Sequence, residues 1–354
     1  MKIEFQGGKI SGRINPPPSK SHTHRAFFLS SMAKGRSTVR GALISEDTES
    51  TLKACESIGA SVIYDVESVM IDGGNIHAPA NKVDAKNSGT TMRLFAGICS
   101  LFPEESFITG DETLLLRPME PLLDALEQMG VKCCSNNGYP PVTIKGPNLG
   151  GKVSVEGSKS SQYATSIIMC APLIQNDTFL TITGKMISEP YIDITIDMMR
   201  QFGAKIEKIS NTLKVSGGTG YSPCDYIVPG DPSSAAFGMV AGAIGGRVIV
   251  SGIDPEERGD AGIVSILEKA GVKVTRKDGD VIVESAGRIK PMDIDVGNVP
   301  DLFPILAVLL STADGESRLY GAPQLKFKES DRLKSTVDML NAIGADATAT
   351  DDGC

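Results

Sequence analysis

The strongest constraint on the fold of this chain is a pattern that recurs about every seventy residues. Each copy has an amphipathic helical segment, then a glycine, then the start of a strand rich in small or β-branched residues. A glycine at this point is typical of a helix that ends on a residue in the left-handed conformation. The glycines are separated by 68 to 73 residues and lie at Gly59, Gly130, Gly203, Gly271 and Gly344.

A second pattern has the same period. In each copy a small or acidic residue precedes an apolar helix, as N-cap residues do. The expected caps are Ser19, Ser88, Ser158, Asp231 and Asp301. Short strands separate the helices, and a hairpin follows the glycine. Chance similarity between amphipathic helices is a poor explanation for two patterns with one period. The sequence therefore predicts an α/β protein in which a β-α-β-α-β-β unit is repeated five times.

Proline and glycine mark the borders between groups of units. A proline triplet at 16–18 precedes the first helix, and Pro223 and the Pro229-Gly230 pair follow the third unit. We expect a three-unit domain at 14–228 and a discontinuous domain of two units at 1–13 plus 229–354, with a hinge and a cleft between them. The fifth unit stops ten residues after Gly344, so we also expect a chain that lacks its last unit.

Composition excludes several classes of protein. Hydrophobic residues make up 41% of the 354-residue chain, no apolar run approaches the roughly 20 residues of a membrane span, and the N-terminus does not resemble a signal peptide. A net charge of −8 disfavours nucleic-acid binding. Seven cysteines without a CxxC pair favour the reducing cytoplasm. His22, His24 and His77 form no metal-binding pattern, and the spacing of the first two favours a solvated surface.

Cationic and hydroxyl side chains gather at the starts of several predicted helices. The free N–H groups and the dipole of a helix start attract anions, whereas a Lys or Arg there is unfavourable unless it meets a negative charge. Any one of these residues is more often a solvated surface side chain, but several at equivalent points of a repeat favour a shared anion site. They are Lys20, Ser21, Arg25, Thr90, Arg93, Arg117, Ser158, Lys159, Ser160, Ser161 and Gln162.

A second cluster lies in the segment LKFKESDRLKSTVDML. Lys328 and Arg332 are four residues apart, which predicts one helix face. Glu329 and Arg332 fit either a solvated ion pair or a carboxylate kept for proton transfer beside a bound anion. Asp301 precedes a very apolar helix, and the sequence does not distinguish an ordinary N-cap from a buried acid there.

At these residues the chain resembles the enolpyruvyl transferases. The matching phrases occur in family order over essentially the whole chain: SKSHTHRA, NSGTTMR, GDETLLLRPM, GSKSSQY, SEPYIDIT, VPGDPSSAAF, VPDLFPILAV and KESDRL. The resemblance implies a two-domain inside-out α/β barrel. It also implies transfer of the enolpyruvyl group of phosphoenolpyruvate to the 5-hydroxyl of shikimate 3-phosphate through a tetrahedral ketal. Phosphate is released, in the shikimate pathway to aromatic amino acids, by a cytoplasmic monomer without metal or organic cofactor.

The resemblance also implies the roles of individual residues. Those implied to hold shikimate 3-phosphate are Lys20, Ser21, Arg25, Ser160, Ser161, Gln162, Ser188, Tyr191, Asp301, Gln324 and Lys328. Those implied to meet phosphoenolpyruvate are Lys20, Gly89, Thr90, Arg93, Arg117, Gln162 and Arg332. Asp301 would take the proton of the 5-hydroxyl and Glu329 would act at the methylene carbon, with Lys20 and Lys328 completing the catalytic set.

Three departures from the family pattern stand out. Leu94 replaces a common proline, Gln324 replaces a common asparagine, and the family's late His-Arg pair and a later lysine have no counterpart. Two alternatives stay open: a transferase that uses UDP-N-acetylglucosamine as acceptor, and an inactive anion-binding fragment. The first lacks its usual loop cysteine near residues 110–118, and the second is suggested only by the early stop.

Overall fold

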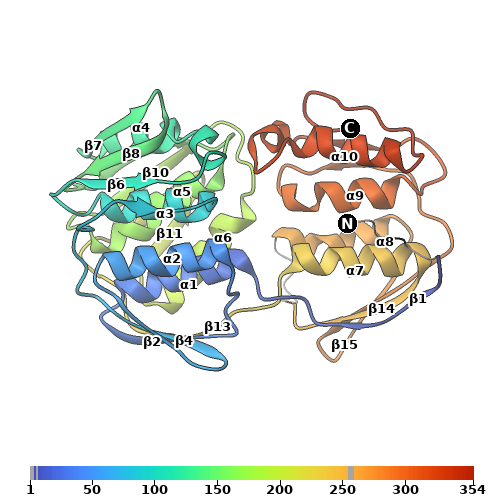
Figure 1. The fold of residues 1–354 in the computed structure, drawn as a ribbon, viewed down its shortest axis with the longest axis horizontal. Helices are drawn as coiled ribbons and strands as arrows, with labels where there is room; N and C mark the ends of the chain where they lie inside the picture. The colour runs from blue at the N-terminus through green and yellow to red at the C-terminus, as the bar shows by residue number, and fades with distance from the viewer. Residues whose placement is uncertain (1–3, 5–6, 254–258) are drawn as a thin grey trace. The chain divides into compact units, whose positions relative to one another are not determined.

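The computed structural model describes residues 4, 7–253 and 259–354, which divide into two compact units. Unit 1 combines Met1–Pro17 with Pro229–Cys354, and unit 2 is Pro18–Val228 (Figure 1). Each unit has its own core of buried hydrophobic residues. Among the described helices, none combines the length and the apolarity that crossing a bilayer requires.

The expected α/β architecture of repeated units is confirmed. The order β-α-β-α-β-β occurs four times, and the described part of the fifth repeat contains β-α-β-α. The first repeat comprises β1 Ile10–Ile14, α1 Lys20–Met32, β2 Gly35–Arg40, α2 Glu46–Ser57, β3 Ser61–Tyr64 and β4 Ser68–Gly73. The second comprises β5 Val83–Asp84, α3 Gly89–Cys99, β6 Ser106–Thr109, α4 Glu120–Gln128, β7 Lys132–Asn136 and β8 Tyr139–Lys145. The third comprises β9 Gly151–Glu156, α5 Ser161–Cys170, β10 Thr178–Thr183, α6 Pro190–Gln201, β11 Ile206–Ile209 and β12 Thr212–Val215.

The remaining repeats follow the same plan. The fourth comprises β13 Asp225–Ile227, α7 Pro232–Gly245, β14 Gly246–Ser251, α8 Ile263–Lys269, β15 Lys273–Lys277 and β16 Asp280–Glu284. The fifth comprises β17 Asp293–Asp295, the 3-10 turn η4 Pro300–Leu302, α9 Phe303–Leu310, β18 Arg318–Tyr320, the 3-10 turn η5 Pro323–Phe327 and α10 Arg332–Ala342. Leu319 of β18 also exchanges two backbone hydrogen bonds with Cys354, at 2.9 and 3.0 Å.

The four-stranded sheets share one order, in which a parallel pair of strands is followed by two antiparallel strands. Two of the sheets, however, exchange their first strands. β13 pairs with β2 in unit 2, whereas β1 pairs with β14 in unit 1, where Ile10 lies opposite Gly246. Unit 1 is therefore built from both ends of the described chain.

The predicted helix ends are confirmed, because all five repeat glycines have φ between 84° and 101°. The predicted caps are only partly correct. Ser88 and Asp231 accept backbone hydrogen bonds at the starts of α3 and α7, and Ser19 precedes α1 without a side-chain cap bond. Ser160, not Ser158, caps α5. Asp301 lies in η4, one residue before the Leu302 that precedes α9, so it is not the N-cap of that helix.

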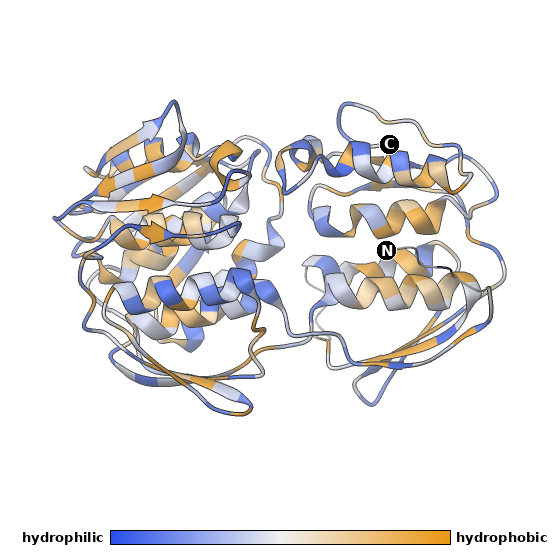
Figure 2. Cartoon of the chain, in the orientation of Figure 1, coloured by the Kyte–Doolittle hydropathy of each residue, from blue (hydrophilic) through white to orange (hydrophobic). Residues whose placement is uncertain are grey.

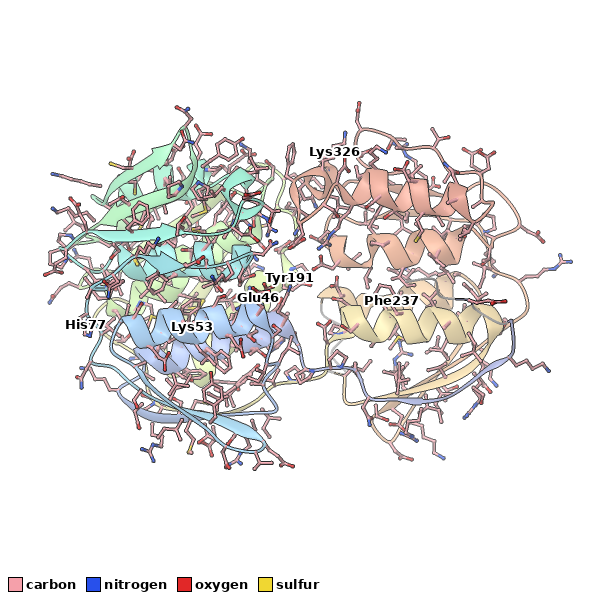
Figure 3. All side chains as sticks on the ribbon, in the orientation of Figure 1. Glu46, Lys53, His77, Tyr191, Phe237 and Lys326 are labelled. Carbon is pink, nitrogen blue, oxygen red and sulfur yellow. The ribbon has the colours of Figure 1, made fainter. Side chains whose placement is uncertain are left out.

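Helices contribute a large share of the buried core residues in each unit. In unit 2, α1 buries ten of its thirteen residues, from Thr23 to Met32. In unit 1, α9 contacts both α7 and α10, and Figure 2 shows its strongly apolar character. The two helices beside it keep some apolar side chains exposed, among them Phe237 on α7 (Figure 3). The helix interiors are therefore committed to packing.

Candidate active site

The start of α1 holds a buried cation. Arg25 is 2% exposed, and no carboxylate among the described residues lies within ion-pair distance of it. Its Nε donates to Thr195 Oγ1 at 2.7 Å and its Nη1 to the Ser21 carbonyl at 2.9 Å. Burial lowers the pKa of Arg25 to about 10, against the raising influence of Tyr191 and Tyr226. The guanidinium is therefore still charged at neutral pH, and a buried unpaired cation suits an anionic ligand.

The start of α6 adjoins this cation. Arg25 Nη2 lies 3.4 Å from the carbonyl oxygen of Tyr191, a residue in the first turn of α6 (Figure 3). Ser188, just before the helix, has φ of 53°, a conformation that a residue other than glycine rarely adopts. Such outliers concentrate at functional sites. The structure thus brings Ser21, Arg25, Ser188 and Tyr191 to one place in unit 2.

Two more cations meet at the start of α3. A Cβ added to Gly89 would lie 3.0 Å from Arg117 Nη1 and 3.5 Å from Arg93 Nη1, so both guanidinium groups lie beside this glycine, where a side chain would otherwise be. Arg117 Nη2 donates to Asn87 Oδ1 at 2.5 Å, and Arg93 stacks 5.4 Å from the centre of the Tyr163 ring. Within the described residues, the buried Nε of Arg93 has no hydrogen-bond partner. Two arginines beside a helix start form a strongly anion-attracting place.

Gln162 connects the starts of α3 and α5. Its Oε1 accepts from Arg93 Nη1 at 2.7 Å, and its Nε2 donates to Thr90 Oγ1 at 2.9 Å. Its own backbone N–H donates to the cap oxygen of Ser160 at 3.2 Å. Ser161, next to it, is buried. The predicted residues Thr90, Arg93, Ser160, Ser161 and Gln162 therefore form one connected group.

Lys20 forms an ion pair with an aspartate of α2. Its Nζ lies 3.0 Å from Asp47 Oδ2, and both side chains are partly exposed. None of Asp47, Asn87, Tyr163 and Thr195 was expected to be a site residue. Three of them lie inside phrases that carry the family resemblance: Asn87 in NSGTTMR, Tyr163 in GSKSSQY and Thr195 in SEPYIDIT. Asp47 is recognised only by the contact with Lys20 that folding creates.

Unit 1 holds an acidic pair bridged by an arginine. Arg332 Nη1 lies 2.5 Å from Asp301 Oδ1, and its Nη2 lies 3.0 Å from Glu329 Oε2. Burial disfavours the charge of Arg332, but attraction and hydrogen bonds from Asp301 and then Glu329 outweigh it and raise the pKa of Arg332. The expected helix face shared by Lys328 and Arg332 is wrong. α10 begins only at Arg332, and Lys328 lies before it in extended backbone after η5.

Gln324 in η5 is a second unusual group of unit 1. It is 8% exposed, and neither its amide nitrogen nor its amide oxygen has a partner among the described residues. An amide left in this state is costly unless a ligand or water completes its hydrogen bonds. In the part of the chain that the structure describes, no group of three His, Cys, Asp or Glu side chains could hold a metal ion.

The repeated β-α-β-α-β-β units and the cationic helix starts define a two-domain enolpyruvyl transferase. A family model described as EPSP synthase (3-phosphoshikimate 1-carboxyvinyltransferase) matches residues 5–354. The chain belongs to this family.

Curated relatives and solved structures agree. A 3-phosphoshikimate 1-carboxyvinyltransferase of Methanocorpusculum labreanum is 47% identical over all of this chain and 85% of the relative's length. One from Methanocaldococcus jannaschii is 37% identical over 98% of this chain and 82% of the relative. A structure of EPSP synthase from Acinetobacter baumannii has a TM-score of 0.81 at 31% identity, and covers 98% of this chain and 81% of its own. These matches take in 98–100% of this chain and 81–85% of the length of the proteins that it matches.

Proposed function

We propose that this chain transfers the enolpyruvyl group of phosphoenolpyruvate to the 5-hydroxyl of shikimate 3-phosphate and releases phosphate, a step on the way to aromatic amino acids. Its family membership favours this reaction over the use of a UDP-N-acetylglucosamine acceptor and over an inactive anion-binding fragment. The observation that carries the proposal is the pair of guanidinium groups, of Arg93 and Arg117, that lie together beside Gly89. Two polyanionic substrates react only if cations offset their mutual repulsion.

Different polar groups of unit 2 bind the two substrates. Shikimate 3-phosphate binds at the starts of α1, α5 and α6, where Arg25 supplies the buried positive charge. The hydroxyl and amide groups that complete this part of the site are Ser21, Ser160, Ser161, Gln162 and Ser188, with the ring of Tyr191 beside them. Phosphoenolpyruvate binds at the start of α3, between Arg93 and Arg117, with Gly89, Thr90 and Gln162. Lys20 serves both substrates.

The residues of unit 1 move the protons. The 5-hydroxyl oxygen attacks C2 of phosphoenolpyruvate while Asp301 takes the hydroxyl proton. Glu329 gives a proton to the methylene carbon, which becomes a methyl group in the tetrahedral ketal. The C–O bond to phosphate then breaks, the departing phosphate takes up the proton that Asp301 holds, and Glu329 takes a proton back from the methyl group. Positioned carboxylates of this kind contribute about 10²–10⁴-fold to rate.

Arg332, Lys328 and Gln324 support these steps. The guanidinium of Arg332 lies on both carboxylates, so it lowers the repulsion between them and an incoming phosphate and itself meets phosphoenolpyruvate. Lys328 adds a second positive charge. The buried amide of Gln324 completes its hydrogen bonds on shikimate 3-phosphate, which supplies the partner that this side chain otherwise lacks among the described residues. No metal or organic cofactor takes part, and the protein acts as a cytoplasmic monomer.

The test is phosphate release by the purified chain. With both substrates present we expect turnover on the order of 1–10 per second and one enolpyruvyl ether, identified by mass spectrometry, for each phosphate. Arg117→Met should abolish most of this activity, whereas Arg36→Met, which alters an exposed arginine paired with Asp72, should not. The proposal is contradicted if phosphate is released only when UDP-N-acetylglucosamine is the acceptor. It is also contradicted if no phosphate is released with either acceptor.

A further inference from the structure

A buried chain of hydrogen bonds crosses the first three helices of unit 2. His24 Nδ1 lies 2.6 Å from Thr51 Oγ1, and that oxygen lies 2.7 Å from Thr91 Oγ1. Thr91 in turn contacts Ser88 Oγ at 2.7 Å. All four side chains are at most 1% exposed. The expectation that His24 is a solvated surface residue is therefore wrong, because α1 turns this face into the core.

The chain joins the two helix starts at which the substrates are proposed to bind. His24 lies one residue before Arg25 on α1, and Ser88 is the residue immediately before Gly89 on α3. Thr51 belongs to α2 and stands between them. A second connection runs beside it, because Thr91 Oγ1 lies 3.3 Å from the carbonyl of Asp47, whose carboxylate meets Lys20.

The direction of the hydrogen bonds follows from the acceptors. The Asp47 carbonyl only accepts, and Ser88 Oγ already accepts from the backbone N–H of Thr91 at 3.1 Å. If Thr91 donates to these groups, Thr51 must donate to Thr91, and His24 must donate from Nδ1 to Thr51. This leaves Nε2 as a bare acceptor. The opposite direction would instead bury an N–H at Nε2, where no partner exists among the described residues. Native structures very rarely leave a buried N–H unpaired.

Charge supports the same state of the imidazole. Burial, then Lys20 and Arg25, lower the pKa of His24 to about 3. The ring is thus neutral at physiological pH and carries one proton. A neutral ring can be buried beside two cations without adding to their repulsion, which a protonated histidine could not.

We propose that His24 is a positioning residue, protonated at Nδ1, that fixes the spacing between the Arg25 end of α1 and the Gly89 end of α3 through Thr51 and Thr91. It touches neither substrate. It acts by fixing the position of the substrate-binding side chains at the start of α1 relative to those at the start of α3. This part of the inference rests on the proposed function. A misplacement of about 1 Å between reacting groups costs on the order of 100-fold in rate.

The decisive variants alter Thr51, because valine keeps its shape and removes its hydroxyl. Thr51→Val should lower kcat roughly 10- to 100-fold, while the Kd of shikimate 3-phosphate alone changes less than about threefold, because each half of the site stays intact. Thr51→Ser keeps the hydroxyl and should restore most of kcat. His24→Ala should resemble Thr51→Val, and His24→Asn should recover activity, because its amide N–H can replace Nδ1–H. Assays run well below the unfolding temperature of each variant.

A spectroscopic measurement tests the hydrogen-bond direction without any turnover. The chain contains three histidines, so ¹⁵N-labelled imidazoles give few signals, and the signal missing in His24→Asn identifies His24. We expect a protonated Nδ1 and a bare Nε2 at pH 7. A proton on Nε2 overturns the assignment. Unchanged kcat in Thr51→Val, or equal loss in Thr51→Ser, overturns the positioning role. An inactive wild type refutes the proposed function instead.

Discussion

Arg332 and Asp301 share a hydrogen bond of 2.5 Å between Nη1 and Oδ1, across 31 residues of sequence. The other arm of the same guanidinium holds Glu329. One cation therefore orders both carboxylates to which we assign proton transfer. The same positive charge lowers the electrostatic repulsion between the two carboxylates.

Asp301→Asn tests whether this acid is catalytic. Asparagine keeps the shape and can still accept from Arg332, but it takes up no proton from a hydroxyl. Turnover should fall by roughly 10²–10⁴-fold with little change in unfolding temperature. Asp338→Asn is the matched control, because that carboxylate pairs with Lys334 on the exposed face of α10. A large loss of stability with activity retained would assign Asp301 a structural role only.

Arg25→Ala tests the proposed shikimate 3-phosphate site. Removal of a desolvated cation that meets a phosphate should weaken binding by about 2–5 kcal/mol, measured by isothermal titration calorimetry. Arg36→Ala, which removes an exposed arginine of the same unit, should bind as the wild type does. If both variants bind shikimate 3-phosphate with equal affinity, its phosphate must contact a cation other than Arg25.

Gly89→Ala tests the space beside the two arginines. The new methyl group would lie 3.0 Å from Arg117 Nη1, so the guanidinium must move by a few tenths of an ångström. We expect KM for phosphoenolpyruvate to rise on the order of tenfold, with stability unchanged or higher, because alanine favours helix by about 1 kcal/mol. Gly262→Ala, where the added carbon meets open space, should change neither. A wild-type KM in Gly89→Ala would mean that phosphoenolpyruvate binds elsewhere.

Asp280→Asn tests whether the carboxylate of Asp280 contributes to stability in a pH-dependent way. Hydrogen bonds from Ser251 and then Arg13 hold the pKa of Asp280 below its ordinary value of 3.8. A lowered folded-state pKa contributes stability that is complete above the unfolded value and is lost as the pH falls toward the folded one. The difference in unfolding temperature between wild type and Asp280→Asn should thus be constant above about pH 5 and shrink below 3.8. A difference that does not change with pH would contradict this role of Asp280.

Sequence periodicity predicted the fold because each repeat depends on local signals. A glycine such as Gly130 marks a helix end through its own backbone, and a neighbouring apolar helix follows from spacing alone. Lys328 was misassigned because a capping aspartate, Asp331, delays the start of α10 by four residues. His24 was misassigned because an i,i+2 pair says nothing about which helix face other elements will cover.

The candidate site was found more by resemblance than by pattern. Its cations were visible as a group at helix starts, yet their pairing was not. That Gln162 joins Arg93 to Thr90, or that Arg25 reaches Thr195 170 residues away, depends on how the helices pack. Such contacts have no local sequence signal, because side chains from distant repeats meet only after the core forms.

The exchange of β1 and β13 sets an order of events during synthesis. Unit 2 is continuous in sequence, so all its strands have left the ribosome once residue 228 has emerged and it can fold early. β1 must wait, because its partner β14 begins 236 residues after Ile10. Closing so long a loop is slow and costly in chain entropy. The first strand made is thus among the last to be paired, and until then it is an exposed edge that a chaperone could recognise.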